Sequence, residues 1–148
     1  MSNNLEKLIV FTSGEQQYGL PLSQLLSIER VKNIATVPNT PAVIEGVILV
    51  RGELIAVVDM KNVFEQIKTE DSIHTRLLVC KWEDKSVALL VEEASDIVQV
   101  EGDAFQDLQE QSIDRSFSKQ LVQMGDRFVT MVDLKAFIAF LETECLAS

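Results

Sequence analysis

The feature that most constrains the fold of this chain is an internal repeat. An apolar run, a polar turn and a second apolar run occur twice, and the copies superimpose at a constant offset of 69 residues, so that Leu8 matches Leu77 and Tyr18 matches Val87. Two apolar runs joined by a polar turn are typical of a β-hairpin. Each half of the chain is therefore predicted to begin with a hairpin of the same kind.

A second repeated block follows each predicted hairpin. Residues 51–53 and 125–127 each lead into an apolar strand at an offset of 74, so about five residues are inserted between the two blocks of the second half. A helical stripe with apolar residues at i, i+3, i+4 and i+7 comes next in each half. Asp59 and Asp133 stand just before these stripes, where a role as helix caps is favoured over a catalytic pair. The stripes consist of Met60, Val63, Phe64 and Ile67, and of Leu134, Phe137, Ile138 and Leu141.

Many short strands at close spacing predict a mainly β fold built from small antiparallel barrels. A duplicated half predicts two barrels, approximately 1–74 and 75–148, related by pseudo-twofold symmetry around a shared hydrophobic core. Short helices complete the prediction, with one turn after Pro21, one or two helices plus loop over 102–121, and a C-terminal helix. No low-complexity linker separates the halves, so we expect a single rigid domain over 1–148.

The charge balance narrows the classes of partner. The chain carries 23 acidic and 13 basic side chains, for a net charge of −10, and such a surface repels nucleic acid and anionic lipid. Its longest apolar run, at 136–141, has only six residues, whereas a membrane-spanning helix needs about 20. The first residues lack the basic start and apolar stretch of a signal peptide. We expect a soluble intracellular protein with no nucleic-acid partner and no direct membrane insertion.

Residues that carry catalysis or bind metals are sparse. His74 is the only histidine and has no cysteine pair near it, so we expect a solvated loop residue and no zinc site. Cys80 lies in an apolar run and is interpreted as a small buried hydrophobe, and a disulfide with Cys145 is not expected in a reducing compartment. Phosphate-binding glycine motifs and nucleophile-elbow motifs are absent from the sequence. We predict that the protein is not an enzyme and has no catalytic residues, metal or cofactor.

One polar feature interrupts an apolar passage. Arg51 and Gly52 separate the apolar runs 47–50 and 54–58. The residues by themselves favour a hairpin turn in which Gly52 takes a positive φ and Arg51 points to solvent. An interface role for Arg51 stays open as the alternative.

An ordered combination of residues stands out in the first half, Asn39-Thr40-Pro41, then Gly46, then Arg51-Gly52, then Val57-Val58-Asp59. With further stretches at 9–11, 18–20, 95–98 and 132–134, the pattern runs through almost the whole chain. At these residues the chain resembles the CheW-like family of chemotaxis coupling proteins. Family members often carry an acidic residue where this chain has Ser27, and this departure bears on affinity for receptors.

The resemblance implies two five-stranded barrels with a hydrophobic core between them, in agreement with the repeat. It implies an adaptor that couples chemoreceptors to a histidine kinase by protein–protein binding, in the cytoplasm at membrane-associated receptor arrays. One barrel end would bind the kinase's regulatory domain, and a groove between the barrels would hold the cytoplasmic hairpin tip of a receptor. The residues that the resemblance places in this receptor groove are Leu25, Ile28, Arg51 and Gly52.

The kinase contact is expected to be an apolar patch at a barrel end, and its candidate residues are Val87, Leu89 and Val91. Two alternatives stay open. One is a coupling protein of a twitching-motility or other non-flagellar chemosensory system. The other is a small-ligand sensor on the same barrels, which would need a pocket with convergent polar groups. The sequence ends at Ser148 without an appended phosphate-receiver domain, so we expect a stand-alone coupling protein.

Overall fold

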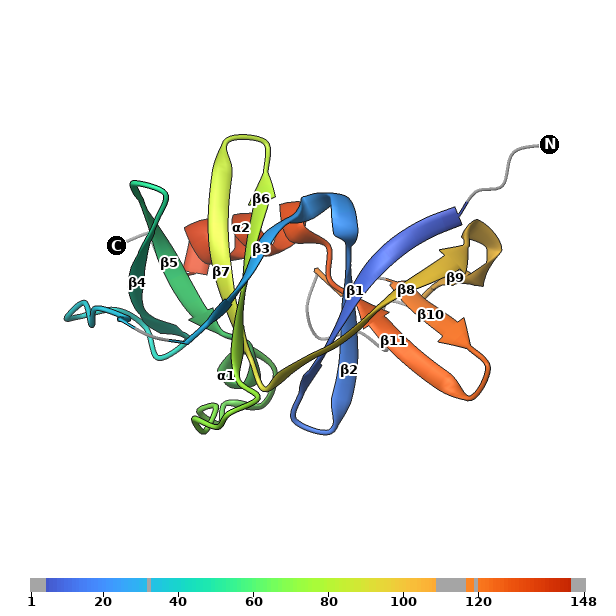
Figure 1. Ribbon diagram of the computed structural model, residues 1–148, viewed down its shortest axis with the longest axis horizontal. Helices are drawn as coiled ribbons and strands as arrows, with labels where there is room; N and C mark the ends of the chain where they lie inside the picture. The colour runs from blue at the N-terminus through green and yellow to red at the C-terminus, as the bar shows by residue number, and fades with distance from the viewer. Residues whose placement is uncertain (1–4, 32, 109–116, 119, 145–148) are drawn as a thin grey trace.

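The computed structural model describes residues 5–31, 33–108, 117–118 and 120–144, and these form two β-sheets with short helices (Figure 1). The prediction of a mainly β protein with a C-terminal helix is confirmed. In chain order the elements are β1 (Leu5–Ser13), β2 (Gln16–Pro21), the 3-10 helix η1 (Leu22–Gln24), β3 (Leu25–Arg30), β4 (Ile44–Val50), β5 (Glu53–Asp59), α1 (Met60–Glu65), β6 (Arg76–Trp82), β7 (Lys85–Val91), β8 (Glu93–Glu101), the 3-10 helix η2 (Gly102–Ala104), β9 (Phe105–Asp107), β10 (Gln120–Met124), β11 (Arg127–Met131) and α2 (Leu134–Glu144).

Two of the predicted short helical segments can be compared with the structure. The turn after Pro21 is present as η1. In the region 102–121, η2 is present and β9 follows it as a short strand that pairs with β10. The remainder of that prediction, at 109–116 and 119, lies outside the described residues.

The two sheets do not follow the two halves of the chain. The first sheet has the strand order β8-β1-β2-β11-β10-β9, and the second has β3-β6-β7-β5-β4. Each sheet combines strands from both halves, which corrects the predicted barrel boundaries of 1–74 and 75–148. The reason is that β3 pairs with β6 of the second half, and β8 pairs with β1 of the first. Figure 1 shows the chain crossing between the sheets before β3 and again on entering β8.

The repeat nevertheless sets the order of the strands. At the offsets of 69 and 74, elements β1 to β5 and α1 correspond to β6, β7, β8, β10, β11 and α2. Replacing each strand of the second sheet by its counterpart gives β8-β1-β2-β11-β10, which is the first sheet without β9. The two sheets therefore share one pairing scheme, while closed barrels and a twofold axis stay predictions.

Hydrophobic residues form one cluster between the two sheets and a further cluster on the far side of each sheet. Strand β1 contributes to two of them, because alternate side chains of a strand point to opposite faces. Leu8 and Val10 join the outer cluster of the first sheet, while Ile9 and Phe11 join the central one. Strand β6 divides between two clusters in the same way. Burial on both faces explains why these strands have continuous apolar runs.

A column of aromatic rings connects the first sheet to the helices. The rings of Tyr18 in β2 and Phe64 in α1 stack with centroids 4.2 Å apart, and Phe117 lies 6.1 Å from Phe64. Phe117 also meets Phe137 of α2 edge-on at 4.9 Å. Aromatic pairs of this kind add to the free energy gained from burial alone. The sequence pattern did not single out Phe117, although it is fully buried.

Both helices begin at the predicted aspartates. The carboxylate of Asp59 accepts hydrogen bonds from two backbone N–H groups of α1, and that of Asp133 accepts one from Ala136 at 3.2 Å. Helix α1 is shorter than its stripe predicted, because Gln66 takes a left-handed conformation that ends the helix before Ile67. Neither of the two α-helices in the described ranges has the length and apolar character needed to cross a membrane.

Candidate protein-interaction surface

The hairpin of β4 and β5 ends in the two-residue turn that the sequence predicted. Gly52 has the expected positive φ, of 82°, and the Arg51 side chain is exposed. Arg51 itself also has a positive φ, of 51°. Two consecutive positive φ values match the twist of the flanking strands, but the left-handed region costs an L-residue with a Cβ roughly 1–2 kcal/mol.

The second copy of the repeat has a glycine where the first has this arginine. Gly125 is the counterpart of Arg51 at the offset of 74, and its φ is 62°. No heavy atom lies within 4 Å of the position that a Cβ on Gly125 would take, so backbone conformation and not space favours glycine there. Arg51 therefore occupies a backbone position that favours glycine. Such local strain often marks a residue with a role in function.

Two leucines flank this turn and point away from the core. Leu49 and Leu54 are directly paired across β4 and β5, with 67% and 70% of their surfaces exposed. Their neighbours Ile48 and Ile55 are buried, as strand alternation requires. Both leucines lie within predicted apolar runs, and their exposure was not predicted from the sequence. Because successive side chains of a strand point to opposite faces, counting outward from the turn at Arg51 could have identified them.

The predicted receptor-groove residues lie on two elements at opposite edges of the second sheet. Leu25 and Ile28 are in β3; the first packs partly against the central core, and the second is 43% exposed. Residues from the end of β3 and from the end of β4 line one groove of about 360 Å³. None of the four predicted residues lines this groove, but Ile28 and Arg51 each adjoin a residue that does. Its lining residues are Glu29, Arg30, Asn33, Ile48, Leu49, Val50 and Leu77.

The candidate residues for the kinase contact are inaccessible in the folded chain. Val87, Leu89 and Val91 have at most 3% of their surfaces exposed and belong to the cluster between the sheets. Strand β7 lies between β6 and β5, so neither of its edges is free. An apolar contact patch must therefore use other side chains, and this corrects the residues named from the sequence.

The described residues contain no group of three or more metal-ligating side chains. Burial raises the pKa of the Cys80 thiol to about 12, so the thiol remains protonated at neutral pH and fills space in the core. The pKa of Tyr18 is raised to about 12 by two causes, of which burial is the larger and the nearby negative charge of Glu65 is the smaller. His74 is exposed in the loop between α1 and β6, as predicted.

Comparison with known proteins relates nearly all of the described fold to one protein family. The family model described as the CheW-like domain matches residues 7–142, which is most of the chain and includes every strand described above except the first two residues of β1. The chain belongs to the CheW-like domain family. This confirms the resemblance found in the sequence, and the β4–β5 hairpin, β3 and the central core all lie inside the CheW-like match.

Individual CheW-like relatives cover nearly the full length of the chain. The chemotaxis protein CheW of Bacillus subtilis is 28% identical over 136 residues, which is 90% of this chain and 86% of that protein. The probable chemotaxis protein CheW of Rhizobium etli is 26% identical over 140 residues, or 93% and 90%. The crystal structure of the scaffolding protein TtCheW from Thermoanaerobacter tengcongensis matches with a TM-score of 0.80 at 25% identity, over 87% of this chain and 84% of that one.

Proposed function

We propose that this CheW-like protein is a non-catalytic adaptor that couples chemoreceptors to a histidine kinase. It binds the regulatory domain of the kinase and the cytoplasmic hairpin tip of a receptor, in the cytoplasm at membrane-associated receptor arrays. The observation that carries the proposal is the β4–β5 hairpin, which presents two exposed leucines and a conformationally strained arginine within the family match. The proposal covers flagellar and non-flagellar chemosensory systems alike.

Arg51 is proposed to contact the receptor tip, together with Gly52 beside it and the apolar side chains of Leu25 and Ile28. A guanidinium suits this contact because its planar fork donates to backbone carbonyls or carboxylates, while its stem covers apolar surface. The groove between β3 and β4 adjoins both Ile28 and Arg51 and gives this contact a concave surface.

Leu54 and Leu49 are proposed as apolar anchors of the kinase contact, in place of the buried residues of β7. Removing exposed apolar surface from water is the dominant favourable contribution to most protein–protein association. Leu54 is the cleaner probe of this contact, because Leu49 also lines the groove next to Arg51. The two leucines stand out because the solvent-facing side chains of an antiparallel strand pair are usually polar.

The coupling role is tested by assembling the complex from purified components. The protein is titrated with a fragment of the kinase regulatory domain and with a receptor hairpin fragment, separately and then together. We expect each to bind, and a complex of all three to elute as one species in gel filtration. A protein that binds neither partner, or releases one on binding the other, would falsify the proposal.

A further inference from the structure

The last residue of β3, Arg30, lies in an electrostatically unfavourable position. In the pairing of β3 with β6 it stands directly opposite Arg76, and like charges directly opposite each other on neighbouring strands destabilise a sheet. Arg76 donates to the backbone carbonyls of Ile73 and Thr75 at 2.8 and 2.9 Å. The exposed side chain of Arg30 forms no hydrogen bond or ion pair with a described residue. Within the described part of the chain, the fold therefore makes no use of its charge.

Arg51 is a second arginine of this kind. It takes a strained backbone conformation and, like Arg30, forms no ion pair with a described residue. One arginine thus costs the fold stability through its backbone and the other through its cross-strand neighbour. The chain has a net charge of −10, but no carboxylate in the described ranges compensates either arginine. Local costs that the fold does not recover often mark residues with a role in function.

The two arginines lie at one groove. Arg30 is among the residues that line the groove of about 360 Å³, and Arg51 directly follows Val50, which lines the groove from β4. Because alternate residues of a strand share a face, Arg30 lies on the same face of β3 as Ile28. The groove therefore places the guanidinium of Arg30 next to two of the residues that are proposed to contact the receptor.

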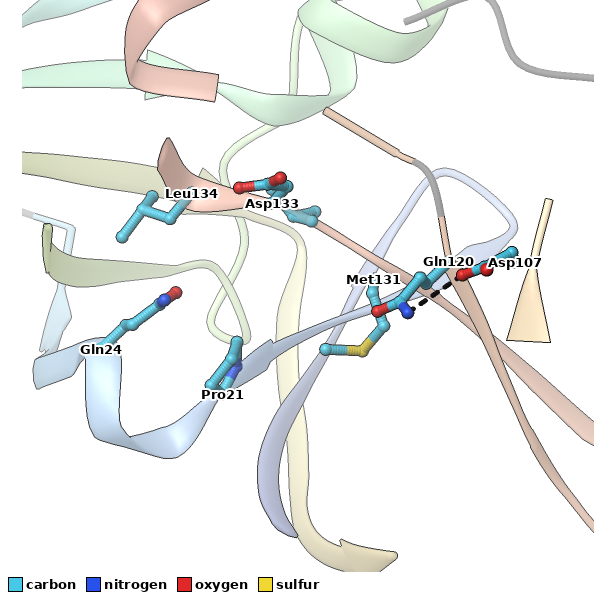
Figure 2. A pocket seen from close by; sticks show the side chains of 8 residues that line it. Pro21, Gln24, Asp107, Gln120, Met131, Asp133 and Leu134 are labelled. Atoms are coloured by element: carbon cyan, nitrogen blue, oxygen red, sulfur yellow. Dashed lines mark hydrogen bonds between the residues drawn. The ribbon is translucent and has the colours of Figure 1, made fainter. Parts of the chain in front are cut away.

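Two other cavities of the described chain are acidic. A cavity of about 350 Å³ between η1 and β10 is lined by Asp107 and Asp133, both shown in Figure 2, and by no lysine or arginine among the described residues. A cavity of about 580 Å³ beside the loop after α1 is lined by three carboxylates, and its one basic residue, Lys68, pairs with Glu45 at 3.6 Å. Of these three sites, the groove at Arg30 is the one where an anionic group would meet an unpaired cation.

We propose that this groove binds an acidic side chain of the receptor hairpin tip, and that Arg30 is a second cationic contact beside Arg51. A guanidinium holds a carboxylate by two parallel hydrogen bonds, so an arginine recognises this group more specifically than a lysine does. The net charge of −10 repels an acidic segment elsewhere on the protein, and the two arginines therefore fix where that segment docks. The inference rests on the proposed function, because that function supplies the receptor tip as the occupant.

Arg30→Gln tests the contact, because glutamine removes the charge and keeps a polar side chain. We expect the Kd for the receptor hairpin fragment to rise about fivefold or more at low salt, and the difference to shrink at 1 M salt, where charges are screened beyond about 3 Å. The matched control is Lys81→Gln, at an exposed cation of β6 that stands opposite Ser86 and outside the groove. This control should bind the receptor fragment normally. The melting temperature should rise in Arg30→Gln alone, because the repulsion from Arg76 is removed.

Glu29 provides a test of the sign of the charge on the occupant. It lines the same groove and is half-buried. Its carboxylate opposes an acidic occupant and would attract a basic one. Glu29→Gln should therefore tighten receptor binding by about threefold, which is the scale of a partly exposed charge pair. Acidic residues of the receptor tip are then replaced one at a time by their amides, and at one of them Arg30→Gln should have no further effect on binding.

Four results would overturn the acidic contact. The first is normal receptor binding by Arg30→Gln. The second is an equal loss of binding in Lys81→Gln, which would show attraction to the overall charge. The third is weaker binding by Glu29→Gln, which would identify a basic occupant. The fourth is a receptor tip in which no acidic residue couples to Arg30. A wild-type protein that does not bind the receptor fragment at all would instead refute the adaptor proposal, and this inference with it.

Discussion

Replacing Arg51 with glycine tests whether this arginine is present for binding at a cost in stability. At a φ of 51°, removing the Cβ relieves the left-handed strain, which is about 1–2 kcal/mol. The added backbone freedom of glycine in the unfolded chain offsets about 0.5–1 kcal/mol of this gain. The expected net effect is a stabilisation of about 0.5–1 kcal/mol, or a rise in melting temperature of about 1–4 °C for a chain of this size.

The same substitution should weaken receptor binding. Loss of a hydrogen-bonded charged contact at an interface costs about 2 kcal/mol or more, so the Kd for the receptor hairpin fragment should rise more than tenfold. Binding of the kinase regulatory domain should change less than twofold. Calorimetric titration with each fragment, alongside thermal unfolding followed by circular dichroism, measures both effects on one preparation.

Glu83→Gly is the matched control for the backbone effect. Glu83 has a φ of 56° in the β6–β7 turn, and its counterpart in the repeat, Gly14, is a glycine with a φ of 64°. This variant should gain similar stability without loss of either partner. If Arg51→Gly binds the receptor fragment normally, the arginine is only a solvated turn residue. If the variant loses stability while Glu83→Gly gains it, the strain argument is wrong.

Further predictions concern the kinase contact, the aromatic column and the response to pH. Leu54→Ser should weaken kinase binding at least tenfold, whereas the control Ile73→Ser, at a more exposed isoleucine in a loop, should leave it unchanged. Kinase binding by the wild-type protein should persist at 1 M salt, where charges are screened beyond about 3 Å, and loss of binding there would show a charge-driven contact. Phe64→Ala removes the ring that stacks on Tyr18, so the free energy of unfolding from urea titration should fall by about 3 kcal/mol; a loss below 1 kcal/mol would contradict the proposed packing. Because the folded pKa values of Tyr18 and Cys80 are raised to about 12 from 10.0 and 9.0, the stability that these two side chains contribute should be constant below pH 9 and should fall as the pH rises toward 12. In a Tyr18→Phe variant the part of this fall above pH 10 should be smaller, and an unchanged profile would argue against the Tyr18 contribution.

The sequence by itself predicted the features that depend on neighbouring residues. The turn at Gly52 requires a positive φ, and Asp59 and Asp133 stand where helix N–H groups need an acceptor, so local chemistry was sufficient. The repeat at fixed offsets predicted the order of elements, and the family resemblance agreed with it. The end of α1 was missed because Gln66, a good helix former, takes a left-handed conformation that its own side chain does not require.

The tertiary structure alone decided which copy of each strand pairs with which. Because β3 and β8 occupy equivalent positions in the repeat, either could pair within its own half or with the other, and a sequence period does not distinguish these pairings. Pairing with β6 and β5 placed β7 in the interior of its sheet and buried Val87, whose apolar run had suggested a contact surface. Leu54 is exposed in the hairpin that β5 forms with β4, the edge strand. Burial on one or both faces of a strand depends on partners distant in the sequence, and only the assembled sheets determine it.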